Sequence, residues 1–425
     1  MRRNFQLGLA NGYLFGFGDA LSSANLVLAL LVRQLGGSLA LVGLLPALQS
    51  GGFLLPQLLV GGRLQAMTYK MPLYRRAAYA RSFTWLLITI IVFCSALLPS
   101  SVALGLLVVF YMIFNIGGGT SALAFQDIVA KVIPPQRRGS FFGTRQLITG
   151  LLTVVIAGPL VRWLLDDAGP LSFPFNFGVL VLFSLLLYSV SLFAFTMVVE
   201  PPQLRLGVRM KVIEGLRMAP RLLRENKNYR WFIVGRILMR VSQIAEPFYL
   251  IYATEVLGLS ASVAGVYLSL RAIAGALSNL VWGRISARRG NRMLLLTSGI
   301  LLVLTPAFAL IGPWVVQMLN LNSLAMMMAI GVVFLLSGAA TDGSNIANTT
   351  YLLEIVPEME RPTYMALANT MLGIVTFLPV LGGWLIALMG YEGSFVLGTV
   401  FGLLGLFASF QLGEPNKAFN APPRD

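Results

Sequence analysis

The sequence has no histidine and only one cysteine, Cys94, among its 425 residues. Zinc and iron sites in proteins rely on imidazole and thiolate ligands, so this composition argues against a membrane metalloenzyme. A single cysteine also excludes a disulfide within the chain. Because the sequence offers no paired-carboxylate or nucleophile constellation either, we expect no metal, no other cofactor and no enzyme activity.

Charge is scarce as well. Charged residues make up 11% of the chain and hydrophobic residues 57%, and the mean hydropathy is +0.80. Such a chain has too few charged side chains to cover a water-facing surface, so lipid must be its solvent. The formal charge of +15 would suit nucleic-acid binding in a soluble protein. Here the basic residues lie in alternate loops and not on a face shared with aromatic residues, so we expect membrane lipids as partners and no nucleic acid.

Twelve apolar runs are long enough to cross a bilayer as helices. They lie near residues 7–32, 39–62, 82–98, 102–127, 141–165, 176–199, 231–254, 263–282, 293–313, 324–349, 363–388 and 394–413. The first run follows Met1-Arg2-Arg3 without a small-residue cleavage site, which is typical of a transmembrane helix and not of a signal peptide. The predicted fold is therefore all-α and integral to the membrane.

The second half of the chain repeats the first at an offset of about 222 residues. Residues 62–66 return as residues 283–287, and residues 35–38 return as residues 257–260. Two like-oriented halves, related by an axis along the membrane normal, are the plan of one large class of transporters. The repeat therefore predicts two pseudo-symmetric six-helix bundles.

The predicted domains follow from the repeat. They are an N-terminal bundle at residues 1–199, a linker at 200–230, a C-terminal bundle at 231–413 and a tail at 414–425. The linker is basic, with apolar residues at helical spacing, which predicts an amphipathic helix on the inner membrane surface. A solvated linker without lipid contact is the alternative.

The charge of the loops predicts the orientation. Basic residues gather in the loops after the second, fourth and eighth runs, with Arg81 counted in the first of these loops, and the intervening loops have few. By the positive-inside rule these loops and both termini face the cytoplasm. We expect a monomeric, multi-pass protein of the cell (inner) membrane.

The loop after the eighth run carries a motif of glycine, acid, base, glycine and base. Gly283, Arg288, Gly290 and Arg292 fit this motif, with Ala287 in place of the acid. Such a tight basic turn lets two helices close together and pair with acids at neighbouring helix ends. The loop after the second run keeps less of the motif, and its remaining residues are Gly62 and Arg63.

A second marker, an acid followed by a proline and an arginine, comes after the fourth run of each half. Its residues are Asp127, Pro134 and Arg138 in the first half and Glu354, Pro357 and Arg361 in the second. With these markers the chain resembles the major facilitator superfamily over nearly its whole length. The resemblance implies the twelve-helix fold of that family and an alternating-access carrier whose spans 1, 4, 7 and 10 line a central cavity. We interpret the motif residues, together with Arg145, as a cytoplasmic gate.

Small residues in the fifth and eleventh runs can be interpreted in two ways, as an antiporter signature or as sites of close helix packing. Gly158-Pro159 in the fifth run partly fits a signature of the antiporter branch of the family, and Pro379 with Gly382-Gly383 in the eleventh run looks similar. Close packing of helices through small residues is the simpler explanation, and we prefer it.

Ionisable residues inside a bilayer cost several kcal/mol, so each one needs an explanation. They concentrate in three of the spans that the resemblance assigns to the cavity. These are Asp19 in the first span, Arg236, Arg240 and Glu246 in the seventh, and Asp342 in the tenth. Polar residues of the cavity spans extend the set of candidates: Asn115, Gln243 and Asn345.

Two interpretations of these charges stay open. In the functional one, Asp19 or Glu246 exchanges a proton while Arg240 holds an anionic part of the substrate. In the structural one, the charges form static ion pairs, with Asp19 pairing with Arg240 and Glu246 pairing with Arg271.

We therefore predict a secondary active transporter that moves a small organic solute across the cytoplasmic membrane by alternating access, with proton coupling as a hypothesis. The alternative is a protein of the same fold that does not transport solute and instead binds lipid or pigment or assists the assembly of a membrane complex. A solute-filled polar cavity open to one side would favour transport. A sealed interior or a lipid-lined lateral groove would favour the alternative.

Overall fold

The computed structural model describes residues 2–65, 67–202, 222–356 and 361–413. Within these residues the chain is helical and contains no strand, which confirms the all-α prediction. Most of the predicted basic linker, from 203 to 221, and the predicted tail from 414 onward lie outside the described residues. By length and hydropathy alone, eight described helical segments are suited to cross a membrane, and several other predicted spans are built from shorter helices.

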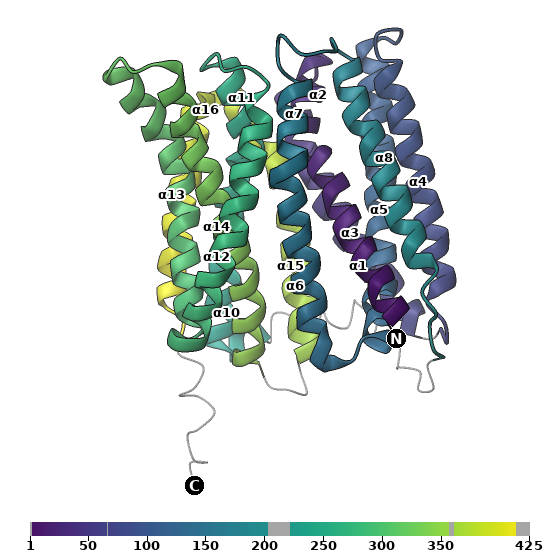
Figure 1. Ribbon diagram of the computed structural model, residues 1–425. Coiled ribbons are helices and arrows are strands. Elements are labelled where there is room, and N and C mark those ends of the chain that lie inside the picture. Colours follow the sequence, from purple (N-terminus) through teal and green to yellow (C-terminus); the bar gives the residue numbers. More distant parts are fainter. Residues whose placement is uncertain (1, 66, 203–221, 357–360, 414–425) are drawn as a thin grey trace. The chain divides into compact units, whose positions relative to one another are not determined.

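The first half contains helices that follow the predicted runs closely (Figure 1). They are α1 (Arg2–Leu21), α2 (Val27–Gln34), α3 (Leu39–Gln65), α4 (Met71–Phe93), α5 (Ser100–Val132), α6 (Pro135–Leu152), the π-helical turn η1 (Thr153–Ala157), α7 (Gly158–Leu164) and α8 (Phe175–Thr196).

The second half repeats this plan. Its helices are α10 (Lys227–Ser242), the 3-10 turn η2 (Gln243–Phe248), α11 (Tyr249–Glu255), α12 (Val263–Arg289), α13 (Asn291–Met318), α14 (Ser323–Ile355), α15 (Arg361–Val375) and α16 (Leu378–Phe410). Gly390 in α16 has a φ of 73°, outside helical geometry, and divides this helix into two segments that correspond to the end of run eleven and to run twelve.

The first and seventh spans are broken at corresponding positions. In the first span, residues 22–26 separate α1 from α2, and the Ser22 hydroxyl donates a hydrogen bond of 2.9 Å to the Gly18 carbonyl. In the seventh span, η2 separates α10 from α11 and contains Pro247, which has no backbone N–H for the helical ladder. Broken helices of this kind form the substrate and ion sites of many transporters.

The third span begins earlier than the apolar run near residue 82 predicts. α4 starts at Met71, where the Glu200 carboxylate accepts hydrogen bonds of 2.8–2.9 Å from the backbone N–H groups of Lys70 and Met71. A carboxylate at a helix N-terminus satisfies free N–H groups and interacts favourably with the helix dipole. Arg81 consequently lies inside α4 and not in the loop before it.

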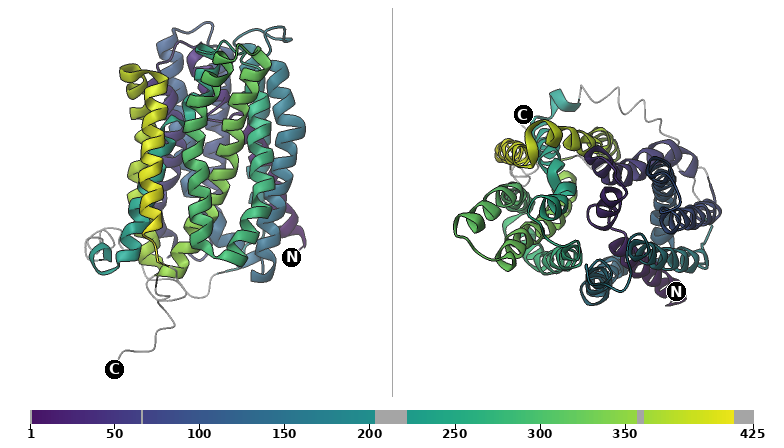
Figure 2. Two further views of the ribbon diagram at one scale, coloured as in Figure 1. Left: turned by 90° about the vertical axis from the view of Figure 1, so that its left-hand side faces the viewer. Right: turned by 90° about the horizontal axis from the view of Figure 1, so that it is seen from above.

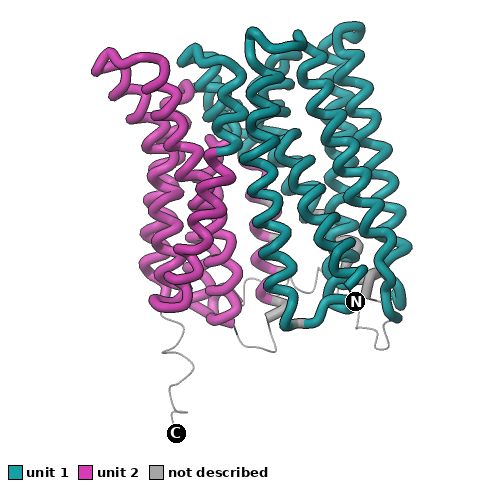
Figure 3. Tube along the Cα trace, in the orientation of Figure 1, with its two compact units in different colours: residues 1–211, 247–269, 379–387 teal, residues 212–246, 270–378, 388–425 magenta. Residues whose placement is uncertain are grey.

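Contacts divide the chain into two compact units (Figure 3). Unit 1 comprises residues 1–211, 247–269 and 379–387, and unit 2 comprises residues 212–246, 270–378 and 388–425. In each unit the long helices run side by side (Figure 2). The division at residues 199 and 231 stays a prediction.

The repeat extends to individual contacts. In the first half, the Asn4 side chain donates to the Val199 carbonyl over 2.9 Å and accepts from the Val199 N–H over 3.2 Å. In the second half, the Asn228 side chain accepts from the Gly413 N–H over 2.9 Å. The same kind of residue therefore ties the start of each half to its end.

Candidate functional site

Asp19 lies two residues before the end of α1, next to the break in the first span. Its Oδ1 atom accepts hydrogen bonds of 3.3 Å from the Tyr188 hydroxyl of α8 and from Gln49 Nε2 of α3. Both donors are neutral, and within unit 1 no described cation forms an ion pair with the carboxylate. Asp19 can therefore gain or lose a proton without breaking an ion pair.

Arg81 is the cation of this site, and the sequence analysis placed it in a loop. It is only 7% exposed, its guanidinium lies over the rings of Phe15 and Phe114 at 4.8 and 4.3 Å, and Nη1 donates to Ser121 Oγ over 3.5 Å. Its Nε has no partner in the described part of the chain. Arg81 and Asp19 interact electrostatically without direct contact.

Aromatic rings and glycines fix the position of these groups. The Tyr188 ring packs against those of Phe15, Trp85 and Phe114 at centroid distances of 4.7–5.2 Å. A Cβ at Gly117 would lie 2.8 Å from Arg81 Cγ, so a larger residue there would displace the arginine. The run of three glycines from residue 117 is the one sequence signal that α5 leaves room for a bulky neighbour.

Asn115 lies on α5 beside this site. Its Nδ2 donates a hydrogen bond of 2.7 Å to the Tyr111 carbonyl of its own helix, and it is 7% exposed. A Cβ at Gly52 of α3 would lie 2.8 Å from the Asn115 Cβ. In this arrangement Asn115 supports the contact between α3 and α5, and its role in binding substrate stays a prediction.

In unit 2, Glu246 and Arg271 form the ion pair that the sequence predicts. Arg271 Nη2 and Glu246 Oε1 are 2.6 Å apart, and Ser337 Oγ of α14 donates to the same carboxylate oxygen over 3.3 Å. Glu246 sits in η2, so this pair connects the break in the seventh span to α12 and α14. With a cation and a hydroxyl already bound, Glu246 is a weaker candidate for proton exchange than Asp19.

Arg236, Arg240 and Gln243 follow one another near the same break. Arg240 Nη1 donates to Gln243 Oε1 over 3.1 Å, and the Arg236 guanidinium lies 5.8 Å from the Phe232 ring centroid. Both arginines are half-buried. Asp19 lies in unit 1 and Arg240 in unit 2, and their predicted pairing stays a prediction.

Asp342 and Asn345 lie on α14. Asp342 Oδ2 accepts from Asn279 Nδ2 of α12 over 3.1 Å, and a Cβ at Gly275 would come within 2.8 Å of the same oxygen. The contact between α12 and α14 thus depends on a glycine. Asn345 is exposed, and its role in binding substrate stays a prediction.

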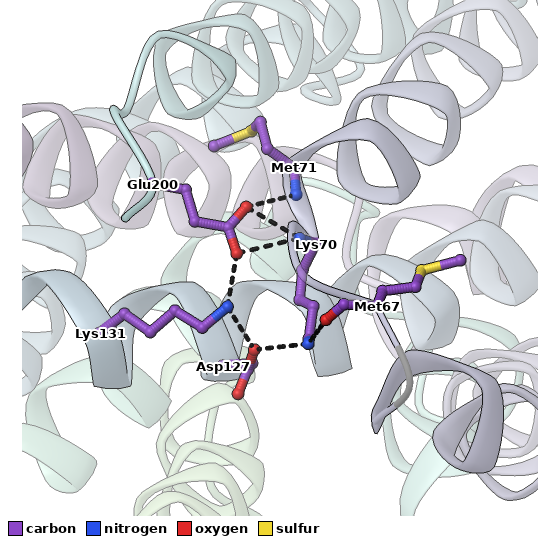
Figure 4. Close-up of polar contacts among 6 residues, drawn as sticks. All are labelled: Met67, Lys70, Met71, Asp127, Lys131 and Glu200. Carbon is purple, nitrogen blue, oxygen red and sulfur yellow. Dashed lines mark hydrogen bonds and ion pairs between the residues drawn. The ribbon is translucent and has the colours of Figure 1, made fainter. Parts of the chain in front are cut away.

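The predicted gate residue Asp127 belongs to an ion network with Lys70, Lys131 and Glu200 (Figure 4). We call the end of unit 1 where this network lies the basic end. Lys131 Nζ is 2.6 Å from Glu200 and 3.1 Å from Asp127, and Lys70 Nζ is 3.7 Å from Asp127 and also contacts the Met67 carbonyl. Burial, and secondarily the Lys131 ammonium, lowers the pKa of Lys70. The network joins α5, α8 and the start of α4 within one bundle.

Arg138 and Arg145 hold neighbouring parts of unit 1. Arg138 donates to the carbonyls of Ile133 and Ala130 at 3.1 and 2.7 Å, which satisfies the free carbonyl groups where α5 ends. Arg145 donates to the Gly8 carbonyl over 3.2 Å, and a Cβ at Gly12 would clash with its side chain. Arg145 therefore fastens α6 to α1 by close contact.

The motif of the second half forms a turn between α12 and α13. Gly290 has a φ of 84° and a ψ of 167°, a conformation open almost only to glycine. Asn291 Nδ2 donates to Glu354 Oε1 over 2.6 Å, and Arg292 Nη2 donates to the Phe410 carbonyl over 3.1 Å. These contacts tie α13 to α14 and α16.

The remaining gate candidates are placed only in part. Gly283 and Arg288 lie in α12, where a Cβ at Gly283 would meet no described atom within 4 Å. Gly62 and Arg63 lie in α3 and Arg361 begins α15, with their side chains outside the described set. The role of all these residues in a gate stays a prediction.

At the opposite end of unit 1, which we call the far end, Arg33 and Glu255 form a bidentate ion pair that the sequence analysis missed. Arg33 Nε lies 2.6 Å from Glu255 Oε1, and Nη2 lies 3.1 Å from Oε2. Arg33 is in α2 and Glu255 ends α11, and the two are separated by 222 residues, the length of the repeat. That separation is the signal that could have predicted the pair, because equivalent positions lie around the repeat axis.

Glycines bring helices of the two repeats together at the far end. A Cβ at Gly265 of α12 would lie 2.2 Å from the Gly158 carbonyl of α7. A Cβ at Gly383 of α16 would lie 2.4 Å from the Ala40 N of α3, and one at Gly43 would lie 2.0 Å from the Pro379 carbonyl. Such contacts require glycine, so close packing through small residues is confirmed for both spans.

Comparison with known proteins agrees with this architecture. The family model described as Major Facilitator Superfamily matches residues 11–331 and 232–425. The chain belongs to the Major Facilitator Superfamily. No curated protein matches it.

Solved structures of several transporters share the fold. A bacterial homologue of the iron transporter ferroportin in an inward-facing state has a TM-score of 0.67 at 16% identity, over 97% of this chain and 99% of that chain. A D-xylose-proton symporter has a TM-score of 0.69 at 16% identity, over 98% of each chain. A point mutant of the nucleoside transporter NupG has a TM-score of 0.71 at 14% identity, over 97% of this chain and 100% of that chain.

These matches confirm the fold expected from the sequence. The chain is a multi-pass membrane protein of a transporter family, with the twelve-helix fold of that family. Identities of 14–16% support the fold alone, and the solute must be argued from the chain's own residues.

Proposed function

We propose that this protein is a secondary active transporter that moves a small organic solute across the cytoplasmic membrane by alternating access and uses Asp19 to couple transport to protons. The contacts at the far end of unit 1 are the observation that best supports this proposal. Helices of both repeats meet there through one ion pair and several glycine contacts. An exposed ion pair contributes little stability, so it forms and breaks at low cost as the far end closes and opens.

Asp19 suits the coupling role because of where it lies and what holds it. It is next to a helix break, and the groups in the described part of unit 1 that donate hydrogen bonds to its carboxylate are the neutral side chains of Tyr188 and Gln49. Arg81 supplies a fixed positive charge nearby. Protonation of Asp19 changes the net charge of this site by one, which is the change that a proton-driven conformational step requires.

The positive-inside rule assigns the basic end to the cytoplasm. The far end then faces outward, and its contacts make the outward side the closed one. We further propose that the halves act as the predicted six-helix bundles, with the basic linker on the inner membrane surface. A monomer is sufficient for this mechanism, since both repeats lie in one chain.

The test begins with the purified full chain. A thermal-shift screen against metabolites and drugs identifies solutes that stabilise the protein, and those solutes are then assayed for counterflow in proteoliposomes. Specific counterflow of one stabilising solute is expected. If stabilising solutes are found and none is exchanged across the membrane, the protein is a binding or assembly protein of the same fold and the proposal is wrong.

A further inference from the structure

Arg236 and Arg240 form no ion pair with the acidic residues that the structure describes in unit 2. Arg236 and Arg240 are one helical turn apart on α10, so their side chains lie on the same face. At about 3.6 residues per turn, this is also the face of the buried residues Tyr229 and Ile233. The two guanidinium groups therefore point toward the interior of the protein and not toward lipid.

Three acidic residues of the spans and span ends in unit 2 are engaged elsewhere. Within the described ranges, Glu246 binds Arg271, Asp342 binds Asn279 and Glu354 binds Asn291. Arg240, one helical turn away, repels the like charge of Arg236. The polar partner of Arg240 is the neutral amide of Gln243.

Such an arrangement is costly in the protein alone. A half-buried charge without a counter-charge loses part of its hydration and gains little in return. Like charges one turn apart on a helix destabilise it further. Such a pair of arginines lowers the stability of the unbound protein. An anion that binds between the two guanidinium groups compensates their charge and restores that stability.

We propose that Arg236 and Arg240, assisted by Gln243, bind the anionic group of the transported solute, and that this solute is a small organic anion such as a dicarboxylate or a phosphate monoester. The inference rests on the proposed transport function. Two guanidinium groups on one face offer forked donors that match the geometry of carboxylate and phosphate oxygens. Both arginines lie next to the break in the seventh span, and broken helices form the substrate sites of many transporters.

The test uses the full chain in neutral detergent, with succinate and glycerol phosphate as probes and with glucose and choline chloride as controls at equal ionic strength. One of the anionic probes should raise the melting temperature, and the controls should not. Arg236→Gln and Arg240→Gln should each weaken binding of that probe roughly tenfold or more, because each loses a charge-assisted hydrogen bond.

The matched control is Arg230→Gln. Arg230 is exposed on another face of the same helix, so its loss should leave binding unchanged. Without any anion, Arg236→Gln and Arg240→Gln should melt at the same temperature as the parent or higher, because each removes an uncompensated charge. A static structural role predicts lower melting temperatures, and that result would overturn the inference.

Other outcomes separate this inference from the transport proposal. Equal stabilisation of the parent and both variants would mean a non-specific salt effect and would overturn the site. Stabilisation by short-chain phosphatidylglycerol through these arginines, without any effect of the soluble anions, would assign the site to lipid and overturn it as a solute site. Counterflow of a neutral or cationic solute that is indifferent to both substitutions would refute the anion inference and leave transport intact. Binding of an anion through the arginines without its exchange would support the site and refute transport.

Discussion

The first and seventh spans occupy equivalent places in the two repeats, and both break at the same point of the repeat, yet the last two helical turns before the break carry opposite charges. The first span has Asp19, held by neutral donors. The seventh span has Arg236 and Arg240, which lack acidic partners in the described part of unit 2. Duplication has kept the helix geometry of the two spans while their chemistry has diverged.

The loop motif precedes α4 in the first repeat and α13 in the second, and the two repeats stabilise the starts of these helices by different interactions. The first repeat fastens the start of α4 through buried charges, with Glu200 and Lys131 only 2% and 13% exposed. The second fastens the start of α13 through a glycine turn and a contact between Asn291 and the exposed Glu354. One repeat therefore depends on ion pairs at a place where the other depends on backbone conformation.

The largest effect that we expect separates the roles of the two broken spans. Asp19→Asn should reduce proton-driven solute accumulation roughly 100-fold and leave solute exchange intact, because asparagine accepts the same hydrogen bonds and carries no proton. Uptake into proteoliposomes with an imposed pH gradient measures this. Asp127→Asn, which changes a carboxylate in the ion network, should keep the response to pH. Full pH-driven uptake by the Asp19 variant would remove the acid from the mechanism.

A smaller effect, on the free energy of unfolding, distinguishes the ion network around Glu200 from the contact between Asn291 and Glu354. Glu200→Gln should lower the free energy of unfolding by about 3 kcal/mol, because it leaves Lys131 and the start of α4 undercompensated. Glu354→Gln should lower it by about 1 kcal/mol or less, because glutamine still accepts a hydrogen bond from Asn291. Unfolding in mixed micelles compares the two. Equal losses would mean that burial does not distinguish these acids.

At the glycine turn we expect the second repeat, and not the first, to be the more sensitive to substitution. Gly290→Ala should lower the free energy of unfolding by about 2 kcal/mol, because alanine is strained at a φ of 84°. Tyr69→Ala at the equivalent place of the first repeat should have almost no effect, since Tyr69 is exposed and has no positive φ. The same unfolding assay applies. A tolerant Gly290 would show that the turn is not what holds α13.

The smallest effect concerns the ion pair at the far end. A double-mutant cycle of Arg33→Gln and Glu255→Gln should give a coupling energy of about 0.5–1 kcal/mol, since the side chains are 29% and 35% exposed. Either substitution should also favour opening of the far end, which maleimide labelling of a single introduced cysteine in a Cys94→Ser background can detect. Unchanged labelling would mean that the glycine contacts alone hold the far end closed.

Much of the fold could be predicted because its signals are local. Apolar runs of spanning length and the repeat predicted the helices. The break in the seventh span was not predicted, although Pro247 is a local signal of it. The start of α4 was missed because Glu200, a residue distant in sequence, stabilises it. Arg81 was misplaced for the same reason.

The sequence predicted which residues belong to the candidate site better than it predicted the contacts between them. Asp19, Glu246 and Arg240 stood out because charge in an apolar run is rare, and the pairing of Glu246 with Arg271 followed from similar depth on consecutive helices. The aromatic surroundings of Arg81 could not be predicted, because packing between four helices has no periodic signal. Nor did the motifs reveal that Asp127 shares its lysines with Glu200.

The bridge between Arg33 and Glu255 carries a historical implication. In a dimer of two identical half-length chains, a residue beside the symmetry axis would face its own copy, so two arginines or two glutamates would oppose each other there. An attraction of unlike charges across the axis requires the two copies to mutate independently. This contact could therefore arise only after the ancestral gene had been duplicated, because only then could the two copies carry different residues at this position.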